Sequence, residues 1–175
     1  MLLPLLEIGR ARAWRWVIGL GLVVVCLGAT TADAQRVNIH GVSQHFNTDD
    51  FIYNERNWGA GYEHDLWAGS YAEVALGGGV YHNSFRNTSV YISSVLTLPR
   101  EAVLQVGLIG MLVTGYDGTH RDPEGNALDL SHTSAITPIV MPGLAVGRTI
   151  QVRAAVLPAP NGFVTGQLSI DLSDW

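Results

Sequence analysis

The feature that most constrains the fold of this chain is a two-residue alternation of apolar and polar side chains, which recurs in short segments. Near the C-terminus, Val164, Leu168 and Ile170 share one face of such a segment, whereas Gln167 and Ser169 share the other. A period of two is typical of a β-strand whose two faces meet different surroundings. Beyond the first 34 residues, no window of comparable length carries the 3.6-residue apolar stripe of a helix, so the pattern predicts an all-β fold.

Eight such segments are separated by turn residues, which is the arrangement expected of an all-β domain. They span residues 37–45, 58–66, 70–82, 89–98, 102–116, 136–146, 149–158 and 162–172. Because a tilted strand of about 9–11 residues can cross a membrane, these lengths suit a transmembrane barrel.

The connections between the segments alternate between short and long. Tight turns are expected near residues 67–68, 99–100 and 147–148, and longer, more polar loops at 47–57, 83–88, 117–135 and 159–161. Aromatic side chains gather near the segment ends, as in the girdles of membrane barrels. Both patterns favour an eight-stranded antiparallel up-and-down transmembrane β-barrel over a soluble sandwich, although alternation alone does not say which face points inward.

The N-terminus has the parts of a cleavable signal peptide. A basic segment with Arg10, Arg12 and Arg15 precedes a short apolar run and a small-x-small cleavage site. The run is shorter than the roughly 18 residues that a membrane-spanning helix needs. We therefore expect residues 1–34 to be a signal peptide and residues 35–175 to form one barrel domain in the outer membrane of a Gram-negative bacterium.

Composition narrows the function classes. The single cysteine, Cys26, falls within the predicted signal peptide, so we expect neither disulfides nor thiol catalysis in the mature protein. The formal net charge of −5 argues against nucleic acid as a partner. The histidines show no metal-ligand spacing, so we expect no metal and no cofactor. We expect a monomer whose partners are phospholipid, lipopolysaccharide and the machinery that assembles outer-membrane proteins.

The predicted lumen has two notable sets of residues. Residues 103–113 are apolar on both faces, so part of the lumen could hold a hydrocarbon chain, or it could be filled by its own side chains. Polar residues that alternation places in the lumen are expected to form a stabilising network, since unpaired charge is costly there. These residues are Glu63, Glu73, Gln105, Gln151, Arg153, Gln167 and Asp171.

Catalytic candidates lie in the loops that share one end of the predicted barrel. Ser84 beside Asn83, with His45 or His82 from the same end, would suffice for acyl transfer or general base catalysis. A Ser-Asn pair in a loop is also common turn chemistry, because both side chains bond to nearby backbone. The residues alone leave both interpretations open.

Several motifs resemble the PagP-type lipid A palmitoyltransferases, which are eight-stranded outer-membrane barrels that move a palmitoyl chain from a phospholipid to lipid A. The most specific is the segment YNERNWGAGY at residues 53–62, which resembles the entrance to the family's second strand. Three further stretches are similar in the same order, at residues 71–72 with 83–85, 136–142 and 157–164.

The resemblance implies a catalytic role for an external His and an Asp-Ser pair. His45 and Ser84 match the family's His and Ser, and Asn83 stands where the family has Asp. The resemblance therefore implies acyl transfer with Ser84 as nucleophile or transition-state donor and His45 as base or orienting group. Asn83 would be a hydrogen-bond donor to an oxyanion. Asn57 also replaces a family proline that helps to open a lateral route between strands.

Two alternatives stay open. The lipid A deacylases carry a His-x-Ser motif, and His82-Asn83-Ser84 has that spacing, but no Glu completes their triad at a matching distance. The chain could also be a PagP-like barrel without catalysis, acting as a structural or interaction protein, and Asn83 is the main feature that favours this.

Overall fold

The computed structural model describes residues 35–48 and 51–173, so the predicted signal peptide and the tail residues 174–175 lie outside the described part of the chain. No helix in those two ranges has the length and apolarity needed to cross a membrane.

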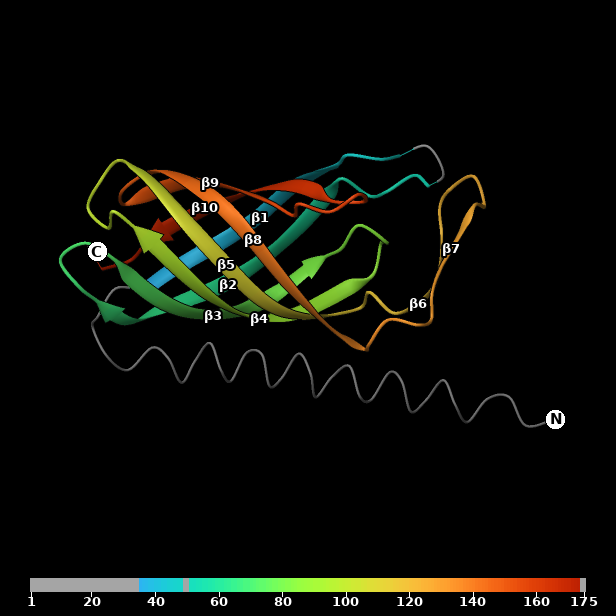
Figure 1. Cartoon of the computed structure of the whole chain (residues 1–175), viewed down its shortest axis with the longest axis horizontal. Helices are drawn as coiled ribbons and strands as arrows, with labels where there is room; N and C mark the ends of the chain where they lie inside the picture. The colour runs from blue at the N-terminus through green and yellow to red at the C-terminus, as the bar shows by residue number, and fades with distance from the viewer. Residues whose placement is uncertain (1–34, 49–50, 174–175) are drawn as a thin grey trace.

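Eight strands form a closed antiparallel barrel in the order β1-β10-β9-β8-β5-β4-β3-β2. They are β1 (Gln35–His45), β2 (Arg56–Ala68), β3 (Glu73–His82), β4 (Thr88–Leu98), β5 (Leu104–Thr114), β8 (Ile136–Gly147), β9 (Ile150–Val156) and β10 (Phe163–Asp171). The first strand pairs with the last, so the sheet has no free edge around the barrel. The predicted all-β, eight-stranded antiparallel barrel is confirmed (Figure 1).

The two ends of the barrel differ, as the loop lengths predict. Short turns join β2 to β3, β4 to β5 and β8 to β9 at one end, and longer loops occupy the other. The longest loop contains a hairpin of β6 (Gly118–Arg121) and β7 (Ala127–Leu130), which stands off the end of the barrel (Figure 1). Alternation did not reveal this hairpin.

One predicted turn is misplaced. The turn expected at residues 67–68 lies at residues 69–72, where the Gly69 N–H donates to the carbonyl oxygen of Ala72 over 2.9 Å. A bulge between Asp65 and Trp67 shifts the register of β2, so Trp67 and Ala68 remain paired with β3.

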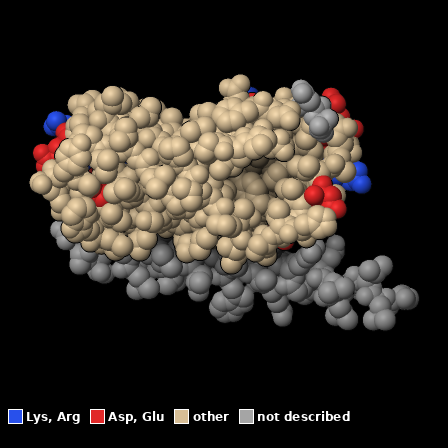
Figure 2. All heavy atoms as spheres, in the orientation of Figure 1, with Lys and Arg blue, Asp and Glu red and all other residues tan. Residues whose placement is uncertain are grey.

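The structure shows which face of each strand points inward. On β4, Ile92 and Leu96 are exposed on the outside, whereas Ser93 and Thr97 point into the lumen and are buried. The other barrel strands largely follow the same rule, with apolar residues outside. Charged side chains gather toward the two ends of the molecule, and the broad middle of the visible face is nearly free of them (Figure 2).

Ion pairs fill the lumen at the end that carries the short turns. The Arg36 guanidinium lies 3.0 Å from Asp65, 2.8 Å from Glu73 and 3.6 Å from Asp171. Three carboxylates around one buried guanidinium leave no unpaired cation in this part of the lumen.

A second polar network lies farther along the lumen. Arg153 Nη1 is 2.7 Å from Glu63 Oε2, and its Nε donates to Gln151, which in turn donates to Gln105. Together the two networks include all the residues predicted for a stabilising network except Gln167. They also close the lumen beneath its outer half.

The barrel wall is incomplete beside the outer half of β8. This strand pairs with β5 along nearly its whole length, but it pairs with β9 only from Gly143 onward. Pro138 and Pro142 have no N–H, so neither residue can donate to a neighbouring strand. Residues 136–142 therefore have no ladder partner on the β9 side.

Candidate functional site

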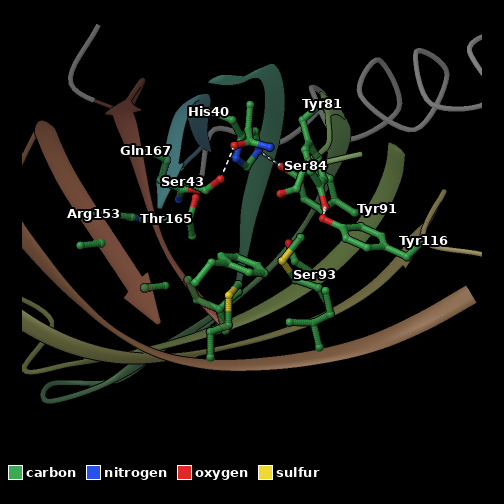
Figure 3. Close-up of a pocket in the computed structure, with 18 of the residues that line it drawn as sticks. His40, Ser43, Tyr81, Ser84, Tyr91, Ser93, Tyr116, Arg153, Thr165 and Gln167 are labelled. Atoms are coloured by element: carbon green, nitrogen blue, oxygen red, sulfur yellow. Dashed lines mark hydrogen bonds between the residues drawn. The ribbon is translucent and has the colours of Figure 1, made fainter. Parts of the chain in front are cut away.

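A cavity occupies the half of the lumen nearest the long loops, above the Arg153–Glu63 pair. It is partly open to the exterior, and the cavity together with its open mouth spans about 750 Å³. One side is apolar and is lined by Ile109, Met111, Ile139, Met141, Ala155 and Phe163. The cavity thus joins an apolar wall on β5, β8 and β9 to a more polar wall on β1, β2 and β10 (Figure 3).

Phenols and an imidazole line the wall formed by β1, β3 and β4. His40 Nε2 lies 2.7 Å from the hydroxyl of Tyr91, and the hydroxyls of Tyr81 and Tyr116 lie 3.0 Å apart (Figure 3). A side chain at Gly61 or Gly79 would collide with the Tyr91 phenol, so glycine at these positions lets the ring reach His40. The alternation of β4 places Tyr91 in the lumen, but sequence analysis did not select it.

Ser84 lies at the loop-bearing end of this cavity. The residue is only 3% exposed, and its carbonyl oxygen accepts a hydrogen bond from the Asn54 N–H over 2.7 Å. Its side chain lines the cavity (Figure 3). A hydroxyl that faces a cavity in this way can form a hydrogen bond to a ligand.

Asn83 is fully buried and bonded on every side. Its amide nitrogen donates to the Ser89 hydroxyl (2.9 Å) and to the Gly115 carbonyl oxygen (2.8 Å). Its amide oxygen accepts from the N–H groups of Phe85 (2.9 Å) and Asn87 (3.0 Å). Both donors and both acceptor positions of the amide are therefore in use. The bonds from the Asn83 oxygen to nearby backbone N–H groups are the turn interactions that the sequence analysis considered for this residue.

His45 is close to the cavity but not bonded to Ser84. Its ring stacks on Tyr53 at 4.0 Å and packs against Phe163, which lines the cavity. Its Nδ1 is buried without a hydrogen-bond partner in the described chain. The topology brings His45 and Ser84 to the same end of the barrel, as predicted, and Phe163 lies beside both His45 and the cavity.

His82 faces away from this site. It is exposed, and alternation along β3 places its side chain on the outside of the barrel, whereas Ser84 is buried and faces inward. The His-x-Ser motif therefore does not bring its two side chains together.

Aromatic residues from three loops form a cap at this end, which sequence analysis did not identify. Phe85 contacts Phe51 at 5.8 Å, stacks on His120 at 4.2 Å and meets Tyr116 edge-on at 5.6 Å. Burial lowers the pKa of His120, although Asp117 acts in the opposite direction. We call Phe51, Phe85 and His120 the aromatic cap.

A hydrogen bond ties the β6–β7 hairpin to the loop after β1. The Ile52 N–H donates to Asp122 Oδ2 over 3.1 Å, and Asn126 donates to both Asp122 oxygens. Burial alone raises the pKa of Asp122, but hydrogen bonds from Asn126, Ile52 and Glu124 outweigh it and hold the pKa below its usual value. The turn at residues 120–126, which lies within the loop predicted at 117–135, thus also anchors one loop to another.

Metal ligation has no candidate in the part of the chain that the structure describes, because no three His, Cys, Asp or Glu side chains cluster there.

A closed eight-stranded barrel with an apolar outside, a polar lumen and an inner cavity defines the class of this protein as a small up-and-down β-barrel. No protein-family model matches the chain, and no curated protein matches its sequence. A solved structure, the N-terminal β-barrel domain of Pseudomonas aeruginosa OprF, is similar with 12% identity and a TM-score of 0.42. That similarity covers 79% of this chain and 96% of the OprF domain, and it carries no information on ligand or activity.

Proposed function

We propose that this protein is an outer-membrane barrel that takes a lipid acyl chain into its lumen and transfers that chain from a phospholipid to lipid A. The observation that carries the proposal is the cavity, which combines an apolar wall with a buried serine hydroxyl at its loop-bearing end.

The exterior of the barrel supports the membrane location. Large apolar side chains such as Val152, Ile92 and Leu144 are more than half exposed on the outside of the sheet. A continuous exposed apolar band of this kind is unfavourable in water, at about 25 cal/mol per Å², but it matches the hydrocarbon core of a bilayer. The charged ends would then lie at the two aqueous faces (Figure 2).

The closed floor of the lumen supports a lipid ligand over a solute. The Arg153–Glu63 pair and the Arg36 network fill the lumen below the cavity, and the aromatic cap covers the loop-bearing end. The unpaired stretch of β8 leaves the wall itself as a route, and a chain that enters there comes from the membrane. The face of the barrel that is visible in Figure 2 is hollowed toward the loop-bearing end.

Ser84 and His45 are the residues that we assign to catalysis. The Ser84 hydroxyl would attack the ester carbon of the phospholipid and pass its proton to His45, which requires the two side chains to move within hydrogen-bonding distance. His45 would give this proton to the lysophospholipid oxygen as that oxygen leaves. A lipid A hydroxyl would then attack the acyl–Ser84 ester, and His45 would pass the proton of that hydroxyl to the released Ser84 oxygen. Because its amide is fully bonded, Asn83 would position Ser84. To stabilise the oxyanion, Asn83 would first have to give up one of its present donor bonds.

A second candidate is a barrel that binds lipid without catalysis. The observations that favour it are the lack of a hydrogen bond to His45 Nδ1 in the described part of the chain and the complete bonding of Asn83. A deacylase that uses His82 is less well supported, because His82 points away from Ser84.

An acyl-transfer assay tests the proposal. Refolded protein in detergent would receive phospholipid labelled in one acyl chain together with lipid A, beside the Ser84→Ala and His45→Ala variants. Labelled lipid A that is lost in both variants would support the transferase. Free labelled fatty acid alone would identify a hydrolase, and no turnover by a folded barrel that still binds the chain would identify the non-catalytic alternative.

A further inference from the structure

The floor of the cavity differs from its walls, and this difference bears on the kind of chain that it accepts. Apolar side chains line the β5 and β8 walls, but the inner end is formed by Arg153, Glu63, Gln167 and Ser93. An unsubstituted alkyl chain would place its terminal methyl group against this polar surface.

The register of the barrel explains how the polar floor is assembled. Gln167 on β10 is the direct partner of His40 on β1 and of Arg153 on β9, so three inward side chains lie side by side. Ser93, which is 7% exposed, comes from β4 on the other side of the lumen. Figure 3 shows Gln167 and Arg153 on one wall and Ser93 on the opposite one.

Two polar groups of the floor face the cavity beside the bonded Arg153 and His40. Arg153 is bonded to Glu63 and Gln151, and His40 is bonded to Tyr91. The Gln167 amide and the Ser93 hydroxyl also line the cavity, so a ligand that reaches the floor meets them. An unsubstituted alkyl chain that covered these groups would offer them no hydrogen bond, which is unfavourable.

The charge of the floor selects the kind of group that would bind there. Glu63 lies 2.7 Å from Arg153 and offsets its charge, so a second carboxylate would gain little from the arginine. A hydroxyl can both donate and accept, which matches the amide of Gln167 and the hydroxyl of Ser93.

We propose that the inner end of the cavity binds a hydroxyl group carried by the acyl chain, so that the preferred ligand is a hydroxylated fatty acyl chain. This inference rests on the proposed binding of an acyl chain in the lumen, but not on catalysis. Gln167 and Ser93 are the specificity-determining residues, and Ser84 holds the opposite, carboxyl end of the chain.

A binding competition tests the inference. Refolded protein in detergent is loaded with the fluorescent fatty acid cis-parinaric acid, which is then displaced by octanoic, lauric and palmitic acids and by their ω-hydroxy derivatives. At the chain length that reaches the floor, the hydroxy acid is expected to bind about tenfold more tightly than the plain acid. Gln167→Leu and Ser93→Ala are expected to remove this preference while retaining binding of the plain acid.

Ser94→Ala is the matched control, because Ser94 is the next residue on β4 and is exposed on the outside. This variant should retain the preference, and heat-modifiable gel mobility checks that each barrel is folded. Plain acids that bind as tightly as hydroxy acids at every length would overturn the hydroxyl site alone. Failure of the probe and of every acid to bind to folded protein would overturn the proposed acyl binding as well.

Discussion

The side-chain amide of Asn83 donates a hydrogen bond to the carbonyl oxygen of Gly115 over 2.8 Å. Asn83 lies before β4 in the sequence, and Gly115 follows β5. This bond ties the loop after β3 to the end of β5, while the Asn83 oxygen holds the N–H groups of Phe85 and Asn87. The loop is thereby fixed with Ser84 directed into the cavity. An amide can perform this double role, because it donates and accepts at once.

Asn83→Asp would introduce the residue that the PagP-type palmitoyltransferases carry at the resembling position, yet we expect it to weaken this protein. A carboxylate retains the two acceptor bonds but cannot donate to Gly115, and it would face that carbonyl oxygen at close range. We expect a loss of about 1–3 kcal/mol in unfolding free energy and lower acyl transfer. Urea unfolding in lipid vesicles measures the first, and the transfer assay measures the second.

The control for this substitution is Asn161→Asp, since Asn161 is exposed in the loop after β9. It should leave stability and activity close to those of the unaltered protein. If Asn83→Asp folded as stably and transferred acyl chains faster, the positioning role of Asn83 would be wrong and a carboxylate mechanism would be right.

The Arg153–Glu63 pair should behave as one buried unit. Arg153→Met leaves Glu63 buried without its partner, and we expect destabilisation of about 3–5 kcal/mol. The double variant Arg153→Met, Glu63→Leu removes both charges, and we expect it to recover most of the loss. A double-mutant cycle based on urea unfolding measures the coupling, and additive effects of the two substitutions would contradict it.

The barrel could be predicted from the sequence because the outside of the barrel and its lumen require opposite polarity at alternate residues. Ile92 and Ser93 differ in polarity because they face opposite sides of one strand, and similar contrasts recur in other barrel strands, although β5 is largely apolar on both faces. The β6–β7 hairpin lies beyond the barrel end, so no such contrast constrains Thr119 or Asp129. Alternation therefore did not detect it.

The candidate site was only partly predictable for a related reason. Strand order alone brings His45, Asn83 and Ser84 to one end of the barrel. Which atoms meet there depends on contacts between loops, such as the Asn83–Gly115 bond across 32 residues of sequence. Local patterns carry no record of such contacts, and the aromatic cap was missed in the same way.

The aromatic cap should loosen on acidification. Burial against Phe85 lowers the pKa of His120 from the usual 6.5, so the folded loop favours the neutral ring. The stabilisation from this packing is complete above about pH 6.5 and declines as the pH falls from there through the lowered pKa, because the unfolded loop binds the proton more tightly. Hydrogen exchange at residues 116–130 should therefore accelerate between about pH 7 and pH 5, after correction for the intrinsic pH dependence.

His120→Phe retains a ring against Phe85 but cannot be protonated. We expect the pH dependence of exchange in this hairpin to disappear in the variant, while Asp122 continues to hold the Ile52 N–H. An unchanged pH profile in His120→Phe would assign the effect to another titrating group and would contradict the role of His120.

The missing donors of β8 should control how fast a chain reaches the cavity. Replacing Pro138 and Pro142 by valine restores two N–H groups to a stretch that has no partner on the β9 side, and it favours a longer β8–β9 ladder. If chains enter through this part of the wall, uptake of cis-parinaric acid in a stopped-flow experiment should slow by about tenfold, which is a barrier increase of roughly 1.4 kcal/mol.

Pro160→Ala, in the exposed loop after β9, is the control that should leave the rate unchanged. Equal uptake rates in the valine variant and the unaltered protein would instead direct the chain through the loops, past Phe51 and Phe85, and the route through the wall would be abandoned.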